Sequence, residues 1–363
     1  MTTDEGAMRR AIELAAGVRS TTSPNPWVGC VVVTGTGDTF EGATSPPGGP
    51  HAEATALTRA GEKARGATLY TTLEPCAHYG RTPPCTKTIV AAGVTRVVFA
   101  IGDPDAVSGH GADELRDAGI EVESGLCADA VRAQLGPYLK HRSTGRPWVI
   151  LKLAATMDGR IAAPDGTSQW ITGEEARSDA HRLRAESDAV LVGAGTARVD
   201  DPALTVRLVE GRDPLRVVLG RAPETARLRP ALELSGDLGA VLDDLGRRGV
   251  VQLLVEGGAS VAHDFHAAGL VDRYVLYLAP ALLGGDDGKS LFTGPGAATL
   301  ASAWRGTIAD VARLGPDLRI ELVPLDDLCA PDPRDGRLVH KGRQERQAEG
   351  SAPDGRGTQC SPA

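Results

Sequence analysis

The chain has 363 residues, a length that allows two or three domains. It carries 39 Lys and Arg against 47 Asp and Glu, a net charge of −8, which argues against a basic face that binds nucleic acid. The first residues include acids and form no unbroken apolar run, and six cysteines are too few for a disulfide scaffold, so we predict a cytoplasmic protein without a signal peptide or membrane helix.

Short apolar runs alternate with helical segments through the first third of the chain. Asp4 can cap a helix whose apolar positions include Met8 and Ile12. Buried strands are predicted at 27–33, 67–72, 96–101 and 120–123, and further helices at 51–60, 84–92 and 112–118. This alternation favours an α/β fold built in layers.

A polar, basic and turn-rich stretch at 138–147 is predicted to separate two domains. A second α/β series follows, with a helix at 174–185 and strands at 148–155, 189–192, 215–219, 251–255 and 273–279. From Ala330 onward Leu338 and Val339 are the only bulky apolar residues, so this segment is predicted to be disordered. The expected organisation is a first domain at 1–145, a second at 146–326 and a disordered tail at 327–363.

One histidine and two cysteines in the first half have the chemistry of a zinc site. His51 stands at a helix start, Cys76 follows a strand, and Cys85 comes nine positions later. An imidazole and two thiolates supply three ligands and leave a fourth tetrahedral position open, which is typical of catalytic zinc. Glu53 is two residues past His51 and is free to move protons during catalysis.

The pattern approaches the His-x-Glu and Pro-Cys-x-x-Cys signature of zinc-dependent base deaminases, although eight residues separate the two cysteines here. The alternative is a closed structural zinc site, for which His78 is the nearest candidate for a fourth ligand. We expect His78 instead to face substrate or solvent.

The segments Asn25–Cys30, His51–Glu53 and Glu74–Cys85 resemble the deaminase half of the bifunctional riboflavin-biosynthesis deaminase/reductases. The long insert between the cysteines, with its Gly-Arg-Thr-Pro-Pro run, is that family's own variant. The resemblance implies a cytidine-deaminase-like three-layer domain, zinc on His51, Cys76 and Cys85, Glu53 as proton shuttle, and Asn25 in contact with the pyrimidine. The family commonly has His and Asn where this chain has Thr44 and Asp105.

The second half lacks the G-x-G-x-x-G fingerprint of dinucleotide-binding domains: Arg198 ends the nearest run, Gly193–Arg198. At 254–260 a buried strand runs into Gly257 and Gly258 and then into a helix. Free backbone N–H groups at such a start suit a phosphate, although the same pattern also occurs in simple tight connections.

The segments Leu151–Arg160, Ser168–Thr172, Asp200–Arg207 and Val255–Gly258 resemble the reductase half of the same family. The resemblance implies a dihydrofolate-reductase-like domain that uses NADPH. It implies cofactor contacts at Ala154, Trp170, Thr196, Asp200 and Gly258, and substrate contacts at Lys152, Ser168, Arg184, Leu204, Arg207 and Glu256. The stretch at 220–250 is shorter than is usual in the family, so a strand or part of the cofactor wall is expected to be missing.

Together these features predict a bifunctional enzyme with zinc and NADPH as cofactors. It would deaminate a diaminopyrimidinone ribosylamine phosphate and then reduce the ribosyl group to a ribityl chain. The resemblance also implies a homo-oligomer, dimer or tetramer, whose partners are small molecules rather than nucleic acid or membrane. Three alternatives remain at this point: a deaminase whose second domain only binds ligand or is structural, a non-enzymatic zinc scaffold, and a nucleic-acid deaminase, which the net charge of −8 disfavours.

Overall fold

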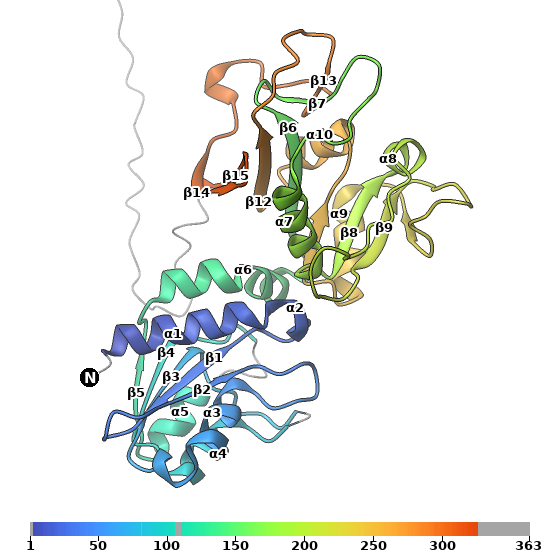
Figure 1. Cartoon of the computed structure of the whole chain (residues 1–363). Coiled ribbons are helices and arrows are strands. Elements are labelled where there is room, and N and C mark those ends of the chain that lie inside the picture. The colour runs from blue at the N-terminus through green and yellow to red at the C-terminus, as the bar shows by residue number, and fades with distance from the viewer. Residues whose placement is uncertain (1–2, 81, 106–109, 326–363) are drawn as a thin grey trace, which may run out of the picture. The chain divides into compact units, whose positions relative to one another are not determined.

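The computed structural model describes residues 3–80, 82–105 and 110–325. Their strands form one five-stranded sheet in the first half, and an eight-stranded sheet and a two-stranded ribbon in the second (Figure 1). The tail predicted to be disordered, 327–363, lies outside the described residues. Each half is described by itself below.

The first half is a sheet of mixed direction with helices packed on it. The strand order is β2-β1-β3-β4-β5, in which β1 is antiparallel to both neighbours and β3, β4 and β5 are parallel. The strands are β1 (Gly29–Val33), β2 (Thr39–Ala43), β3 (Thr68–Leu73), β4 (Arg96–Ile101) and β5 (Glu121–Ser124). The helices are α1 (Asp4–Gly17), α2 (Arg19–Thr22), α3 (Ala52–Ala60), α4 (Cys85–Ala92), α5 (Gly111–Asp117) and α6 (Ala128–Thr144), and a short 3-10 turn covers Gly61–Ala64.

The core of this half is aliphatic, as the low aromatic content requires. Val31, Leu69 and Val97 come from three neighbouring strands and are fully or almost fully buried, with Met8 of α1 among them. Helix α1 lies so close to β1 that a Cβ on Gly29 would stand 1.9 Å from the carbonyl oxygen of Ala11. A glycine is therefore required at this crossing.

One expectation for the first half was wrong, and one strand was not predicted. The stretch 138–147 is not a turn-rich linker: its first seven residues are the end of α6, which stops before Gly145 in the left-handed conformation. Gly136 and Pro137 lie inside α6 and weaken its helical pattern. Strand β2 was not predicted, because its sequence, TFEGA, has no sustained apolar run.

The second half has a central sheet with the strand order β10-β9-β8-β11-β6-β12-β15-β14. The run from β10 to β12 is parallel, and β15 and β14 continue it antiparallel. The strands are β6 (Trp148–Thr156), β8 (Ala189–Gly193), β9 (Leu215–Leu219), β10 (Leu232–Leu234), β11 (Gln252–Val255), β12 (Arg273–Ala279), β14 (Gly306–Leu314) and β15 (Asp317–Pro324).

Helices α7 (Glu174–Ala185), α8 (Ala194–Val199), α9 (Leu238–Arg247) and α10 (Ala259–Ala267) connect these strands, and β7 (Arg160–Ala162) pairs with β13 (Lys289–Ser290). The central strands are buried on both faces, with one cluster around Leu151, Leu191 and Leu253 and another around Ile150, Val190 and Leu254. Alternate residues of the same strands thus pack against different helices.

The stretch 220–250 was expected to lack a strand or part of the cofactor wall relative to the family, and this stays a prediction; the structure has one strand and one helix there. This stretch holds β10, which pairs with β9, and the amphipathic helix α9, which buries Val241, Leu242 and Leu245. The hairpin β14–β15 was not predicted: β14 is exposed along much of its length, and β15 is mostly half-buried.

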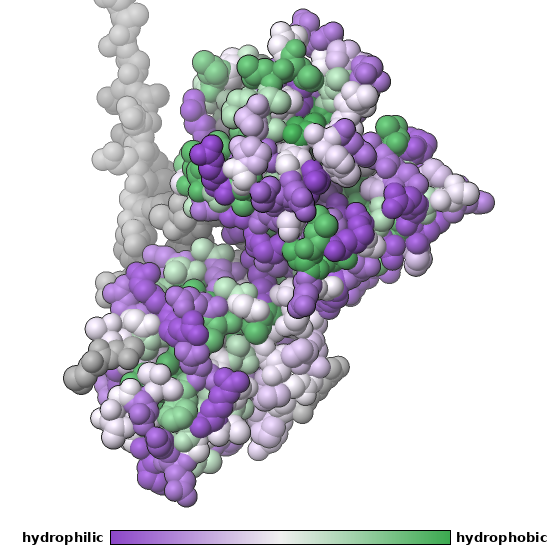
Figure 2. Space-filling view, in the orientation of Figure 1, coloured by the Kyte–Doolittle hydropathy of each residue, from purple (hydrophilic) through white to green (hydrophobic). Residues whose placement is uncertain are grey.

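The face shown in Figure 2 is largely hydrophilic, with hydrophobic residues in small groups between hydrophilic ones. Among the described residues, no helix is long and apolar enough to cross a membrane.

Candidate active sites

Three side chains from separate segments meet at one edge of the five-stranded sheet. His51 caps the start of α3, Cys76 follows β3 after a short turn, and Cys85 is the first residue of α4. Their potential ligand atoms all lie within 4.8 Å of one another. Among the residues that the structure describes, this is the one such group of three or more His, Cys, Asp or Glu side chains.

The distances in this group fit a tetrahedral zinc ion. His51 Nδ1 lies 3.6 Å from Cys76 Sγ and 3.3 Å from Cys85 Sγ. Zinc bonds of about 2.0 Å to nitrogen and 2.3 Å to sulfur place such atoms about 3.5 Å apart in a tetrahedron. The other ring nitrogen, Nε2, lies 3.4 Å from the hydroxyl of Thr82, an outer contact that orients the ring.

The surroundings of Cys76 favour its thiolate, the form that binds metal. Hydrogen bonding from Cys85 and His51 holds the pKa of Cys76 well below its usual range, against the opposing effect of burial. The backbone N–H of Cys85 donates to Cys76 Sγ over 3.4 Å. The donor set, its spacing and its charge therefore fit zinc.

Glu53 lies in the first turn of α3 and is only 4% exposed. Burial raises the pKa of its carboxyl group to about 6. A carboxyl group with a pKa near neutrality can both accept and donate a proton at physiological pH.

A cavity of about 420 Å³ adjoins this group, and Glu53, His51 and Cys76 are among its lining residues. Asn25 lines the same cavity, so four of the five sequence-predicted residues of this half line one space, and Cys85 lies beside His51 at 3.3 Å. His78 also lines it and is not part of the metal-capable group, in agreement with its expected position.

The two departures from the family pattern, Thr44 and Asp105, also line this cavity. The hydroxyl of Thr44 is held by the backbone of Val28, whose N–H donates to it over 3.0 Å. Asp105 faces Arg142 of α6, with 3.9 Å between carboxylate and guanidinium. Arg142 and Tyr138, which reasoning from sequence placed in a linker, belong to the lining because α6 extends to Thr144.

In the second half, Lys152, Arg184 and Glu256 form a buried charged cluster. Arg184 donates from Nε and Nη2 to the two carboxylate oxygens of Glu256, over 2.5 and 2.9 Å. Lys152 Nζ lies 3.9 Å from the same carboxylate. These contacts hold the pKa of Glu256 at about 2 despite its burial, so the carboxylate is ionised at neutral pH.

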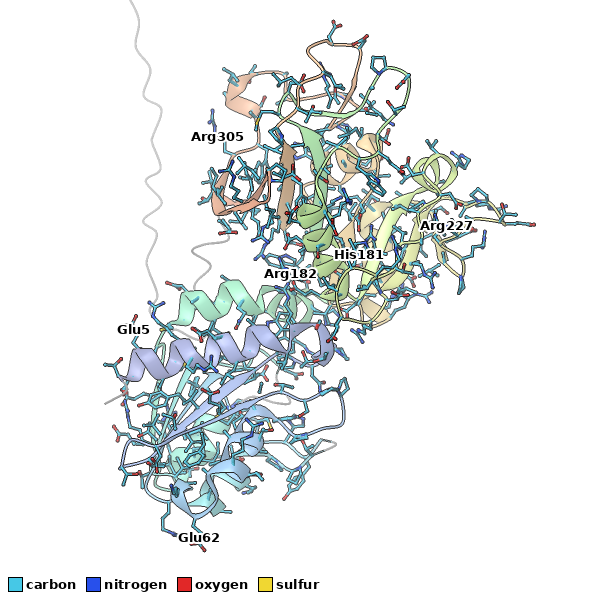
Figure 3. The ribbon with its side chains drawn as sticks, viewed as in Figure 1. Glu5, Glu62, His181, Arg182, Arg227 and Arg305 are labelled. Carbon is cyan, nitrogen blue, oxygen red and sulfur yellow. The ribbon has the colours of Figure 1, made fainter. Side chains whose placement is uncertain are left out.

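Arg207 joins this cluster through two neighbours. Its backbone N–H donates to Nδ1 of His181 over 3.0 Å, and its guanidinium donates to the hydroxyl of Thr205 over 2.6 Å. Arg184 Nη1 donates to the carbonyl oxygen of Thr205. His181 lies on α7 (Figure 3) and was not singled out in the sequence, where a histidine on a helix carries no distinctive signal.

Leu204 precedes this segment and is buried, with a φ of 53°, a value unusual for a branched side chain. Such strain is held in place by surrounding structure and is common at binding sites. Leu204 therefore fixes the backbone that presents Thr205 and Arg207.

Two sequence-predicted cofactor residues meet where adjacent parallel strands end. Thr196 lies in α8 after β8, and Gly258 caps α10 after β11. A Cβ on Gly258 would stand 3.1 Å from the hydroxyl of Thr196, and one on Gly257 would stand 2.6 Å from Val261. The absence of side chains at both glycines leaves backbone N–H groups accessible at a helix start, which fits a nucleotide phosphate.

The remaining predicted residues of this half are more dispersed. Ser168 and Trp170 line a second cavity of about 170 Å³, whose described lining includes neither Thr196 nor Arg184. Trp170 is 70% exposed and packs against the guanidinium of Arg177. Ala154 lies on the same face of β6 as Lys152, and Asp200 ends α8 at the surface.

Comparisons with known families match both halves. Residues 1–101 match the family model described as the cytidine and deoxycytidylate deaminase zinc-binding region. Residues 147–319 match the model described as the RibD C-terminal domain.

Individual relatives match over most of their length. The chain is 44% identical to riboflavin biosynthesis protein RibD of Mycobacterium tuberculosis, an alignment that covers 87% of this chain and 96% of the relative. It is 40% identical to the Escherichia coli protein of the same name, with 88% and 99% covered.

Solved structures agree with the fold. RibD of Acinetobacter baumannii superposes with a TM-score of 0.82 at 40% identity, covering 88% of this chain and 98% of that one. A diaminohydroxyphosphoribosylaminopyrimidine deaminase/5-amino-6-(5-phosphoribosylamino)uracil reductase of Thermotoga maritima gives 0.80 at 36% identity, with the same coverage. These matches confirm the expected fold class, a cytidine-deaminase-like half followed by a RibD reductase half.

Proposed function

Because the chain belongs to the family of bifunctional riboflavin-biosynthesis deaminase/reductases, we propose that it catalyses two consecutive steps on one pyrimidine substrate. The first half replaces a ring amine of 2,5-diamino-6-ribosylamino-4(3H)-pyrimidinone 5′-phosphate with oxygen from water and releases ammonia. The second half reduces the ribosyl group of the product to a ribityl chain with NADPH.

The observation that carries the deaminase assignment is the convergence of a zinc ligand set and a buried carboxyl group on one cavity. In our proposal His51, Cys76 and Cys85 hold the metal, and zinc, when bound, supplies a Lewis acid that activates water. Glu53, whose pKa is raised to about 6, takes a proton from the attacking water and delivers it to the leaving amine. Asn25 contacts the pyrimidine from the lining of the same cavity.

In the reductase half the chain's own residues bind and orient two ligands. NADPH, when bound, supplies the hydride. Thr196 and the Gly258 turn are proposed to receive its phosphates, with Ala154, Trp170 and Asp200 as further cofactor contacts. Lys152, Arg184, Arg207 and Glu256, with Ser168 and Leu204, are proposed to hold the ribose phosphate of the substrate. The contacts between Lys152, Arg184 and Glu256 support this grouping.

The alternative of a second domain that only binds ligand or is structural is not favoured. The RibD C-terminal domain model matches 147–319, which is most of the second half. The domain limits 1–145 and 146–326, the cytoplasmic location and the homo-oligomer stay predictions.

The test of this function is a single incubation of the zinc-loaded protein with the pyrimidine substrate and NADPH. We expect ammonia to be released and NADPH to be consumed in equal amounts, with a ribityl product identified by mass spectrometry. Ammonia release without NADPH oxidation would contradict the reductase assignment, and the absence of both would contradict the whole proposal.

A further inference from the structure

The region around His181 carries more positive than negative charge. Three positive charges lower the pKa of its imidazole: the guanidinium groups of Arg184 and Arg207 and the ammonium group of Lys152. The carboxylate of Glu256 acts in the opposite direction and raises that pKa. Glu256 is already engaged by the fork of Arg184. An excess of cations around a histidine that is only 6% exposed indicates a site for an anion.

Hydrogen bonding fixes which ring nitrogen of His181 carries the proton. The backbone N–H of Arg207 points at Nδ1 over 3.0 Å, so Nδ1 must offer a lone pair. Burial, together with the charges of Arg184 and Arg207, lowers the pKa of His181 to about 4, so the ring is neutral at physiological pH. A neutral ring that accepts at Nδ1 carries its hydrogen on Nε2.

The group that faces Nε2 is another donor. Nη1 of Arg184 lies 3.4 Å away, and a guanidinium has no lone pair to offer. One hydrogen of Nη1 is already donated to the carbonyl oxygen of Thr205, so its second hydrogen and the Nε2 hydrogen are the two that face each other, an arrangement that is costly when buried. An oxygen placed about 2.9 Å from each nitrogen would satisfy both, and a phosphate oxygen suits this position because its charge strengthens both bonds.

We propose that His181 Nε2 and Arg184 Nη1 together bind one oxygen of a phosphate monoester in the reductase half. This inference rests on the proposed function, which offers two sources of that group: the 5′-phosphate of the pyrimidine substrate and the 2′-phosphate of NADPH. His181 is then a specificity-determining residue that separates phosphorylated ligands from their dephosphorylated counterparts.

Two substitutions separate this role from a purely structural one. In His181→Asn the amide oxygen occupies the place of Nδ1 and keeps the acceptor for Arg207, but no donor remains near Nε2. In His181→Gln the amide nitrogen reaches the place of Nε2 and keeps the donor, but the acceptor is lost. Phosphate binding predicts the larger defect in His181→Asn, whereas mere support of the Arg207 segment predicts the larger defect in His181→Gln.

The experiment is titration calorimetry of the full-length protein and both variants with ribose 5-phosphate, NADP⁺ and NAD⁺. We expect His181→Asn to lose about tenfold or more in affinity for one phosphorylated probe, and His181→Gln to lose clearly less. A loss of affinity confined to ribose 5-phosphate would show that His181 and Arg184 bind the phosphate of the substrate. A loss confined to NADP⁺, with NAD⁺ unchanged, assigns the cofactor phosphate.

Three results would overturn the inference: equal affinities in all three proteins, a larger defect in His181→Gln, or no binding of either phosphorylated probe by the unsubstituted protein. The calorimetric unfolding transition of the second half checks that both variants fold. A failure of the proposed function is distinguishable, because the unsubstituted protein would then leave NADPH unoxidised while the probe affinities still follow the expected order.

Discussion

His51 Nδ1 lies 3.3 Å from the Sγ of Cys85, although 34 positions separate the two residues in sequence. The contact exists because α3 and α4 both begin at the same edge of the sheet, where the turn after β3 also delivers Cys76. The sheet and the two helix starts thus place the three ligand atoms within 4.8 Å of one another.

Replacement of a ligand cysteine should therefore remove the metal and the deaminase step together. In Cys76→Ser we expect less than one tenth of the bound zinc of the unsubstituted protein and loss of ammonia release, with NADPH oxidation of separately supplied deaminated product retained. Elemental analysis of the purified protein gives the zinc content. Cys127→Ser is the matched control, because Cys127 lies outside the metal-capable group. Full zinc content in Cys76→Ser would contradict the ligand assignment.

Removal of the Glu53 carboxyl group should separate metal binding from proton transfer. We expect Glu53→Gln to keep its zinc and to release ammonia about 10²–10⁴ times more slowly, because an amide cannot shuttle the proton. Ammonia release is measured under saturating substrate, and Glu62→Gln, at an exposed position, serves as the control. An unchanged rate in Glu53→Gln would show that another group moves the proton.

The effects of substituting Arg184 and Glu256 on the free energy of unfolding should be strongly coupled, because the two side chains form an ion pair. Both side chains are largely buried, so Glu256→Gln or Arg184→Met alone leaves one charge without its partner and should cost about 3–5 kcal/mol of stability. The double variant should recover most of that loss while NADPH oxidation stays impaired. A double-mutant cycle on calorimetric unfolding measures the coupling, and additive effects would contradict it.

Acid should destabilise the second half partly through His181. Its pKa is about 4 in the folded protein against 6.5 when unperturbed, so the unfolded chain takes up the proton first as pH falls. Stability contributed by the neutral ring is therefore present above about pH 6.5 and is lost between there and about pH 4. As the pH falls from about 6.5 to about 4, the unfolding temperature of the unsubstituted protein should approach that of His181→Asn. Parallel curves would show that the folded and unfolded states protonate alike.

A glycine that touches no ligand should affect zinc retention. A Cβ on Gly111 would stand 1.8 Å from the carbonyl oxygen of Pro75, the residue before Cys76. We expect Gly111→Ala to displace this turn and to raise the rate of zinc loss to a chelator about tenfold or more, since a misoriented ligand weakens the site. Gly17→Ala, where a Cβ would meet nothing within 4 Å, should leave the rate unchanged.

Features that depend on the residue pattern within a short segment could be predicted from the sequence. The buried strands β4 and β8 are nearly continuous apolar runs, and their positions agree with expectation to within about two residues. The zinc ligands were identifiable because their chemistry is rare and their spacing is distinctive. Helix α6 was not predicted, because Gly136 and Pro137 interrupt its helical sequence pattern. In the folded protein, tertiary contacts outweigh the low helix propensity of these two residues.

Long-range pairings could not be predicted from the sequence. Arg184 and Glu256 were each expected to contact substrate, but the sequence does not show that they pair with each other across 72 positions. The importance of His181 depends on the backbone N–H of Arg207, 26 positions away, which fixes its tautomer. Neither contact leaves a periodic or spacing signal, because each arises only when the sheet brings the two segments together.

The most direct test of the two-step account is an order-of-addition assay with Glu53→Gln. Supplied with the diaminopyrimidinone substrate and NADPH, this variant should release almost no ammonia and oxidise almost no NADPH. When the deaminated intermediate is supplied instead, it should oxidise NADPH at the rate of the unsubstituted protein. Rapid NADPH oxidation with the first substrate, or none with the intermediate, would contradict the account of two separate sites acting in sequence.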